Sequence, residues 1–305
     1  IREEIKKGIK KSKIIEISNR KKAIVKAINN LKTGNILIVA GKGHEKIQQI
    51  GNRKIFLSDR KVIFSSIKKK NLSLSKDLKL NILNERFSQK ILSTNSVINK
   101  ASINSKIIEK NDIFFAIKGK INDGNKFVTQ AIKKKASIAV VNNIQKKLSK
   151  NKQVSSLNPL GVLTESAKIF RQNISTKIIA ITGSCGKTTL KELLGSTLNK
   201  ISKTSISPKS YNNKYGVPLS LFNINQNDDY GVLEVGMDKK GEIHQLSNII
   251  HPDVSVITNI NYAHAKNFKN IRQIALAKSE IINNTKDNGY VVLNADDSFF
   301  GLHKK

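Results

Sequence analysis

One short segment combines the residue types and the spacing of a phosphate-binding loop. In Ile178–Leu190, I-I-A-I-T-G-S-C-G-K-T-T-L, an apolar run typical of a buried strand leads through a turn with two glycines into a helical pattern. Backbone N–H groups of such a turn, with the N-terminus of the helix, can bind phosphate oxygens. Ile181 stands where the longer form of the motif has its first glycine, so this is a shorter variant. We predict that Lys187 reaches the β- and γ-phosphates of a nucleotide and that the Thr188 hydroxyl binds Mg²⁺. The full set of predicted nucleotide contacts in the loop is Gly183, Ser184, Cys185, Gly186, Lys187, Thr188 and Thr189.

A carboxylate and two amides downstream could complete such a site. The apolar run 230–235 predicts a strand that ends near Glu234. A carboxylate at the end of a buried strand can hold Mg²⁺, which prefers oxygen ligands, and a solvent-exposed acid is the alternative. Asn212 and Asn213 lie in a polar turn before a helical segment, where they could bind ligand oxygens or cap the helix.

Four more polar residues lie near the ends of later predicted elements. His264 follows a strand predicted over 254–259, and Lys278 lies in a helix predicted over 271–282. A strand predicted over 290–294 ends on Asn294, with Asp297 three residues later, which suits recognition of a nucleotide base or ribose. Open α/β sheets bind ligands at the carboxyl ends of their strands, so we expect the groups that follow these strands near the phosphate loop. His264 could be an ordinary surface histidine, and Lys278 is by itself only one more lysine.

Composition narrows the class of protein. The chain has 305 residues and a formal net charge of +33, which would ordinarily suggest nucleic acid or an anionic membrane as partner. The positive charge is nearly all lysine and is scattered along the chain, and aromatic residues make up only 5%. Nucleic-acid binders interleave aromatic side chains with clustered basic groups, so we expect neither a nucleic-acid nor a membrane partner.

A single cysteine, Cys185, argues against a disulfide framework and favours a reducing cytoplasm. No apolar run approaches the length of a membrane-spanning helix. The chain begins with Ile1 and its sole methionine is Met237, so we expect a piece of a longer polypeptide.

The elements that must position these residues indicate an α/β fold with several domains. The central domain is expected to be of the phosphate-loop ATPase type, a mostly parallel sheet flanked by helices, with smaller α/β domains before it. A first small unit is predicted from strands 14–18, 36–40 and 54–57, a helix over 21–31 and a helix opening at 58–60. The lysine- and serine-rich stretch 68–79 is predicted to be a connector. A second unit is predicted from strands 112–117 and 137–141 and a helix over 127–134, before the helix 162–172 that leads into the phosphate-loop strand.

Seven features in order resemble the Mur ligase family, the ATP-dependent amide-forming enzymes of peptidoglycan precursor synthesis. They are T-G-S-C-G-K-T-T, Y-N-N-K-Y-G-V-P, L-E-V-G-M, H-P-D-V-S-V-I-T-N-I, the following His264, A-L-A-K-S-E-I and V-L-N-A-D-D. The resemblance implies ATP and Mg²⁺, with Thr188, Glu234 and His264 as metal-side groups. It implies catalytic roles for Lys187, His264 and Lys278, the last at a position that several members carry as a carbamylated lysine.

Within this family, the part from residue 80 onward resembles the ligase that adds D-Ala-D-Ala to the UDP-N-acetylmuramoyl (UDP-MurNAc) tripeptide. The segment F-F-A-I-K-G that ends at Gly119 is similar to that enzyme's UDP-sugar domain. Asn104-Ser105-Lys106 stands where the family usually has Asp-Ser-Arg, which leaves Ser105 as the candidate contact. The implied contacts to the UDP-sugar substrate are Ser105, Gly119, Asp123, Asn212 and Asn213.

The first 70 residues resemble a different member, the ligase that adds the third residue of the peptide, often meso-diaminopimelate. The turn G-K-G-H-E implies contacts from Gly41 and Glu45 to that amino acid. We therefore expect a fusion of two consecutive ligases. Residues 1–70 would be the C-terminal portion of the first, 71–79 a linker, 80–160 a UDP-sugar domain and 161–305 a truncated ATP-binding domain. The implied partners are the UDP-MurNAc-peptide, D-Ala-D-Ala and meso-diaminopimelate, bound by a monomer.

Two other functions stay open from the sequence. A folylpolyglutamate synthase shares the ATP-dependent ligation and the short phosphate loop, but does not need the segment 100–150 or the G-K-G-H-E unit. A basic nucleic-acid-binding or scaffold protein predicts binding that falls steeply with salt and is indifferent to ATP.

Overall fold

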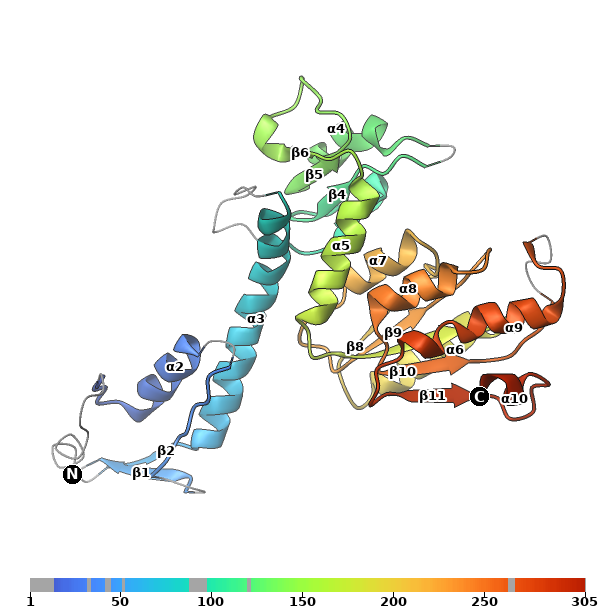
Figure 1. Cartoon of the computed structure of the whole chain (residues 1–305). Coiled ribbons are helices and arrows are strands. Elements are labelled where there is room, and N and C mark those ends of the chain that lie inside the picture. Colours follow the sequence, from blue (N-terminus) through green and yellow to red (C-terminus); the bar gives the residue numbers. More distant parts are fainter. Residues whose placement is uncertain are drawn as a thin grey trace. The chain divides into compact units, whose positions relative to one another are not determined.

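The computed structural model describes residues 14–31, 34–41, 45–50, 53–87, 98–119, 122–262 and 267–304 (Figure 1). The chain divides into two compact units, Ile1–Leu74 and Ser75–Lys305. None of the helices in the described ranges is both long enough and apolar enough to cross a membrane.

The first unit has a small core between two helices. Helix α2 (Arg20–Asn30) is capped by Asn19, whose side chain accepts a hydrogen bond from the Lys22 amide. Strands β1 (Ile47–Ile50) and β2 (Arg53–Phe56) pair antiparallel. Helix α3 (Asp59–Arg86) begins in this unit. The buried core residues are Ile24, Ile28 and Val62.

Two strands expected in this unit are absent, and those predictions were wrong. Residues 14–18 and 36–40 form no strand, although 54–57 and the helix from 58–60 are confirmed by β2 and α3. Ile36 and Ile38 are 89% and 83% exposed, whereas Leu37 and Val39 pack on the core. An apolar run is buried on both faces only where other strands flank it. Among the described residues of this unit the one sheet is β1–β2, which does not include 36–40.

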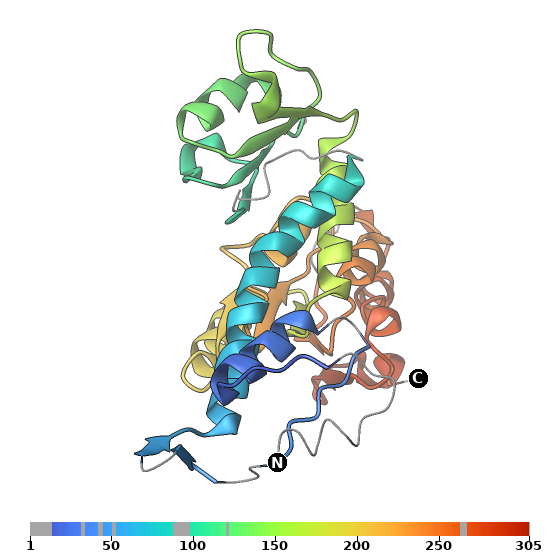
Figure 2. The same cartoon turned by 90° about the vertical axis from the view of Figure 1, so that its left-hand side faces the viewer.

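The stretch 68–79, predicted to be a connector, instead lies inside the 28-residue helix α3 (Figure 2). The boundary between the two units, Leu74 and Ser75, falls within this helix. Lysine and serine suggested a loop, but residues 59–86 contain neither glycine nor proline to end a helix. Polar composition alone was therefore a poor guide to backbone conformation here.

The second unit contains a four-stranded parallel sheet in the order β3-β4-β5-β6. Successive residues of β4 alternate between its faces: Ile113 and Phe115 enter the large core of the unit, whereas Phe114 packs in a smaller cluster with Val128 and Ala131 of α4. The elements of this part are β3 (Ala101–Ser102), η1 (Ser105–Ile107), β4 (Ile113–Phe115), η2 (Gly124–Phe127), α4 (Val128–Lys133), β5 (Ile138–Val141), η3 (Lys150–Lys152) and β6 (Gln153–Ser155).

A five-stranded parallel sheet in the order β11-β10-β7-β9-β8 forms the rest of the unit (Figure 1). This confirms the predicted α/β class with a mostly parallel sheet flanked by helices. Its strands are β7 (Lys177–Thr182), β8 (Thr204–Ile206), β9 (Tyr230–Glu234), β10 (Val254–Ile257) and β11 (Tyr290–Leu293). Its helices are α5 (Pro159–Gln172), α6 (Lys187–Leu198), α7 (Gly216–Phe222), α8 (Glu242–Ile250), α9 (Ile271–Ser279), η5 (Ile282–Asn284) and α10 (Phe300–His303).

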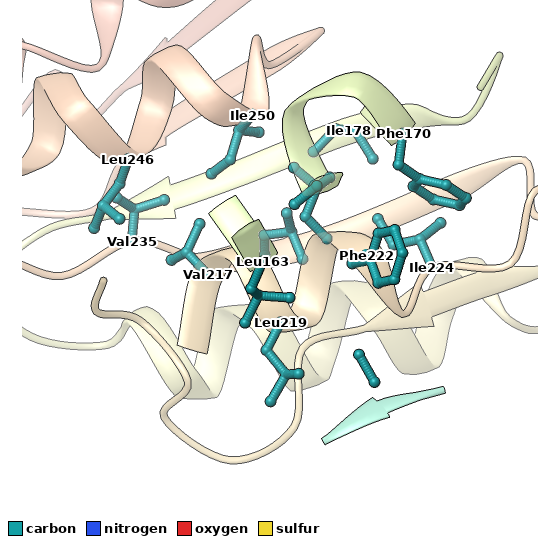
Figure 3. Packing of buried hydrophobic residues seen from close by; sticks show 14 of the residues in the cluster. Leu163, Phe170, Ile178, Val217, Leu219, Phe222, Ile224, Val235, Leu246 and Ile250 are labelled. Carbon is teal, nitrogen blue, oxygen red and sulfur yellow. The ribbon is translucent and has the colours of Figure 1, made fainter. Parts of the chain in front are cut away.

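Helices bury both faces of this sheet. Ile178 and Ala180 of β7 face the large core, where α5, α7 and α8 pack, and Figure 3 shows Ile178 among the side chains of these helices. Ile179 and Ile181 point the other way, into a cluster with Leu190, Leu194 and Leu198 of α6. This double coverage explains why β7 reads as a continuous apolar run, and it leaves the carboxyl edge of the sheet for polar chemistry.

A buried lysine lies where the two sheets of the second unit meet. Lys79 of α3 is 6% exposed, and its ammonium group donates to the Asn99 carbonyl oxygen at 3.0 Å. The same group lies 5.4 Å and 5.5 Å from the ring centroids of Phe170 and Phe222. Burial lowers the pKa of Lys79 from 10.5 to about 8.

The low pKa of Lys79 leads to a prediction of how the stability of the protein depends on pH. Because the folded-state pKa lies below the unfolded-state value, the unfolded chain holds the proton more tightly between pH 8 and 10.5. Stability from this group therefore rises with pH across that window. Between pH 7.5 and 10 this effect raises the free energy of unfolding by about 2 kcal/mol, and Lys79→Met should remove that rise. Urea unfolding of parent and variant at both pH values measures it, with Lys133→Met, at an exposed position of α4, as control. An identical pH dependence in parent and Lys79→Met would contradict the assignment.

Candidate phosphate-binding site

The loop between β7 and α6 has a backbone that requires glycine at two positions. Gly183 has φ 144° and Gly186 has φ 78°, both in the region that side chains rarely adopt. A Cβ atom at Gly183 would lie 1.9 Å from the Thr258 hydroxyl oxygen. Helix α6 begins at Lys187, so the loop leads directly into a helix N-terminus. This is the strand–loop–helix arrangement that the sequence predicted for phosphate binding.

The segment after β10 holds the loop in place. The Asn259 side-chain oxygen accepts a hydrogen bond from the Cys185 amide at 3.0 Å. The Asn259 backbone carbonyl accepts one from the Ser184 amide at 2.9 Å. The Thr258 hydroxyl donates to the Cys185 carbonyl oxygen at 2.6 Å. Sequence reasoning missed Thr258 and Asn259, although polar residues directly after a buried strand were the signal available. These contacts pre-organise the backbone that a phosphate group would meet.

The loop lysine lies over its own loop. The Lys187 ammonium group donates to the carbonyl oxygens of Gly183 at 2.8 Å and Ser184 at 3.2 Å. These carbonyls hold the charge at the mouth of the loop, within reach of the position where the Gly186 amide and the first turn of α6 could hold a phosphate.

Two of the three predicted metal ligands, Thr188 and Glu234, meet at the end of β9. Glu234 is 2% exposed, and β9 pairs with β7 so that Glu234 lies opposite Ile181. The Thr188 hydroxyl donates to one carboxylate oxygen of Glu234 at 2.7 Å, and the Asn212 amide donates to the other at 2.7 Å. A carboxylate beside a hydroxyl is a donor set that suits a hard cation such as Mg²⁺. No group of three or more His, Cys, Asp or Glu side chains gathers anywhere in the described ranges.

A buried lysine lies beneath the loop. Lys278 of α9 is 1% exposed and donates to the Gly183 carbonyl oxygen at 2.9 Å. Burial, followed by the nearby charge of Lys187, lowers the pKa of Lys278 from 10.5 to about 7. The structure thus brings together Lys187, Thr188, Glu234 and Lys278 at the carboxyl edge of the sheet.

A pocket of about 610 Å³ lies beside this cluster. Gly236, two residues after Glu234, forms part of its wall, and Gly119 and Asn122 from the four-stranded part form another. The remaining lining residues are Asn213, Lys214, Tyr215, Asp238, Lys239, Glu242, Gln245 and Leu246. The pocket therefore extends from the four-stranded part of the unit to the edge of the phosphate-loop sheet.

Comparison with known proteins identifies this part of the chain. The family profile of the Mur ligase middle domain matches residues 181–305. This segment belongs to the Mur ligase family. The middle domain thus includes the loop, Glu234 and Lys278, and the predicted family is confirmed.

Several relatives are similar over a longer stretch. The UDP-N-acetylmuramoyl-tripeptide--D-alanyl-D-alanine ligase of Buchnera aphidicola subsp. Acyrthosiphon pisum is 37% identical over 210 residues, which are 68% of this chain and 46% of that protein. The Bacillus subtilis enzyme of the same name is 33% identical over 66% of this chain and 44% of its own length. The chain spans about half the length of the curated relatives it matches.

Solved structures agree on the fold. MurF from Acinetobacter baumannii aligns with a TM-score of 0.65 at 30% identity, over 74% of this chain and 50% of that one. MurF ligase from Thermotoga maritima, solved in complex with ADP, aligns with a TM-score of 0.59 at 30% identity, over 70% of this chain and 49% of that one.

The two predicted asparagines differ in what they contact. Asn212 holds the Glu234 carboxylate, as described above. The Asn213 side chain accepts from the amides of Tyr215 and Gly216, both at 3.0 Å, which is the capping role left open by the sequence, and it also lines the pocket.

The other residues predicted around the middle domain are held by local contacts. Asp297 accepts from the Ile260 amide at 2.6 Å and the Phe299 amide at 2.8 Å, and the Asn294 side chain accepts from the Asp296 amide at 3.1 Å. These bonds tie the segment after β11 to the segment after β10. His264 lies outside the described residues.

In the four-stranded part, the predicted sugar contacts are spread over three places. The buried Ser105 hydroxyl donates to the Gln130 side chain at 2.7 Å, and Gly119 lines the pocket. Asp123 caps η2, and hydrogen bonds from Asn125 lower the pKa of its carboxyl group. In the first unit, Gly41 has φ 99° and Glu45 is exposed, while residues 42–44 between them lie outside the described ranges.

Proposed function

We propose that this chain carries the substrate-binding and ATP-binding parts of a ligase that joins D-Ala-D-Ala to a UDP-MurNAc-tripeptide. The observation that carries the proposal is the Thr188–Glu234–Asn212 cluster, which places a charged carboxylate and a hydroxyl directly beside a glycine-built phosphate loop. Relatives that bear this activity in their names support the substrate.

Each residue of the site has a chemical task in this proposal. The amides of the loop and Lys187 hold the ATP phosphates, which positions the γ-phosphate for attack by the terminal carboxylate of the peptide. The attack forms an acyl phosphate and releases ADP, and the amine of D-Ala-D-Ala then displaces phosphate through a tetrahedral intermediate. Mg²⁺, when bound by Thr188 and Glu234, would neutralise the phosphate charge.

Lys278 and His264 are proposed as further catalytic groups. A pKa of about 7 leaves a large neutral fraction of Lys278 at neutral pH, and carbamylation of an amine needs that neutral form. The carbamate would replace a buried cation with a buried anion on the metal side of the loop. His264 is proposed to serve a second Mg²⁺, and Asn294 and Asp297 to contact the nucleotide.

Residues 1–70 are proposed to be the C-terminal portion of the preceding ligase, with Gly41 and Glu45 directed at its amino acid. The division of the chain between Leu74 and Ser75 supports two separate modules in one polypeptide. Sequencing of the gene upstream of residue 1 tests this: a preceding reading frame that does not encode the remainder of such a ligase would contradict the fusion. A cytoplasmic, monomeric protein is part of the same proposal.

Titration calorimetry tests the function directly. We expect the chain to bind a non-hydrolysable ATP analogue with Mg²⁺ and, independently, the UDP-MurNAc-tripeptide, because the loop and the 610 Å³ pocket are separate features of one unit. A folate substrate and single-stranded DNA are the matched negative ligands. Binding of ATP together with the folate but not with the UDP-MurNAc-tripeptide would favour a folylpolyglutamate synthase, and DNA binding that is indifferent to ATP would favour the basic scaffold.

A further inference from the structure

Helix α6 contains a buried lysine to which the proposed mechanism gives no task. The Lys191 side chain is 0% exposed, although removing an ammonium group from water is costly. Lys191 lies four residues before Gly195, where a Cβ atom would lie 2.2 Å from the Ile206 side chain. Both residues therefore lie on the face of α6 that packs on β8. A methionine of similar length would fill this space without burying a charge, so the contacts of the ammonium group are what the lysine adds.

The ammonium group ties α6 to the segment 207–212, which follows β8. It donates a hydrogen bond to the backbone carbonyl oxygen of Lys209 and lies 3.1 Å from a carboxylate oxygen of the exposed Glu192. Lys209 has φ 48°, a left-handed conformation that residues other than glycine rarely adopt. Residues 208–210 are exposed, so little apolar burial holds this bend against the helix. A buried charge-assisted hydrogen bond holds it instead.

The segment 207–212 also carries the amide that holds Glu234. At one end the Ser207 hydroxyl accepts from the Glu234 amide at 3.3 Å. At the other end the Asn212 side chain donates to the Glu234 carboxylate at 2.7 Å, and the Asn212 carbonyl oxygen accepts from the Gly236 amide at 2.7 Å. A Cβ atom at Gly236 would lie only 2.8 Å from the Asn212 side chain. The fit is close, so a small shift of the segment changes the contact between Asn212 and Glu234.

Helix α6 therefore reaches the Glu234 carboxylate by two routes. Thr188, in its first turn, donates directly to one oxygen at 2.7 Å. Lys191, one turn later, holds the segment whose Asn212 donates to the other oxygen. With each oxygen assigned to its own donor, the carboxylate has one orientation, and its Thr188 side is the side predicted to meet a metal ion.

We propose, on the basis of the function given above, that Lys191 is a positioning residue for the Mg²⁺ site. It fixes the segment 207–212 against α6, so that Asn212 keeps Glu234 in the orientation that suits a metal ion beside the ATP phosphates. Lys191 is fully buried, and it acts through Asn212 rather than on the nucleotide.

The first test measures the affinity of the whole chain for a non-hydrolysable ATP analogue in Mg²⁺ and in EDTA. Lys191→Met should lower the ratio of these affinities about threefold, less than the roughly tenfold loss typical when a direct partner of a metal ligand is removed. Affinity in EDTA should stay, because Thr258 and Asn259 hold the phosphate loop independently of Lys191. Lys79→Met is the matched control, because it removes another buried lysine of the same unit, whose contacts are different, and it should keep the parent ratio.

The second test reads the position of the segment without nucleotide or metal, by hydrogen exchange of backbone amides. The Asn212 amide donates to the Ser210 carbonyl at 2.8 Å, and the Gly236 amide donates to the Asn212 carbonyl. Both amides should lose protection in Lys191→Met, whereas the amides of the central strand β7 should keep theirs. Lys191→Gln, whose amide is one bond shorter than the lysine chain, should give the same two results and replaces Lys191→Met if that variant does not fold.

Each other outcome overturns a stated part of the proposal. A parent ratio together with parent protection in the Lys191 variants overturns the positioning role and leaves the proposed function in place. A change in the ratio alone, or in protection alone, overturns the route through Asn212, because one link is then missing. Loss of protection throughout the unit shows that Lys191 only supports the fold. ATP binding by the parent that Mg²⁺ does not strengthen overturns the metal site and this inference with it, and absence of ATP binding by the parent contradicts the proposed function itself.

Discussion

Replacing Lys187 with alanine is expected to weaken ATP binding about 100-fold while the fold stays intact. Within the part of the chain that the structure describes, the Lys187 ammonium group bonds only to carbonyl oxygens of its own loop, at 2.8 Å and 3.2 Å. The shape of that loop is set by Gly183, Gly186 and the Asn259 contacts, so removal of the lysine leaves the loop supported. A charge-assisted hydrogen bond to phosphate contributes about 2 to 3 kcal/mol, and about 1.4 kcal/mol corresponds to tenfold in affinity.

Calorimetric titration of the ATP analogue into parent and Lys187→Ala measures this effect, and urea unfolding measures stability. Lys200→Ala is the matched control, because it removes an exposed lysine just beyond the C-terminal end of the same helix. ATP affinity of Lys187→Ala within a factor of about two of the parent would show that nucleotide does not bind at this loop.

The phosphate loop could be predicted from sequence because every feature that defines it is local. An apolar strand, two glycines with positive φ and a helix start follow one another directly along the chain, and the structure has each of them in place. The strand that ends on Glu234 was also predictable, because the residue that follows a buried run must lie at the sheet edge. Neighbouring residues determine the geometry in these cases.

Contacts between distant segments were not predictable in the same way. Thr258 and Asn259 hold the loop from 73 and 74 residues away, and their role depends on β10 lying next to β7 in the sheet. Asn213 was considered for ligand binding and helix capping alike, and only the backbone geometry shows that it caps. A single sequence carries no information on which strands become neighbours.

In the first unit, local sequence patterns predicted the wrong secondary structure. The run I-L-I-V-A over 36–40 has the composition of a buried strand, yet Ile36 is 89% exposed in the described structure. Strand formation needs partners for the backbone, and pairing is a property of the assembled sheet rather than of the run itself. For residues 68–79 the error was the reverse: a connector was predicted where helix α3 continues. Lysine and serine are tolerated in a helix that lacks glycine and proline.

Replacing Glu234 with glutamine is expected to abolish the strengthening of ATP binding by Mg²⁺. The substitution keeps the shape of the side chain but removes the negative charge that a hard cation needs. Thr188 and Asn212 both donate to the carboxylate now. An amide has only one oxygen, so with Asn212 still donating to it the Thr188 hydroxyl loses its acceptor and can only accept from the new amide N–H. That loss costs about 1 to 3 kcal/mol of stability for a buried group, and it affects ATP binding equally with and without metal.

The decisive quantity is therefore the ratio of ATP affinities measured in Mg²⁺ and in EDTA, for each protein separately. We expect this ratio to be at least about tenfold in the parent, as for one charge-assisted contact, and close to one in Glu234→Gln. Glu165→Gln removes an exposed carboxylate on α5 and should keep the parent ratio. A ratio in Glu234→Gln equal to that of the parent would place the metal elsewhere. Because each ratio is internal to one protein, a general loss of stability cannot imitate the loss of the metal contact.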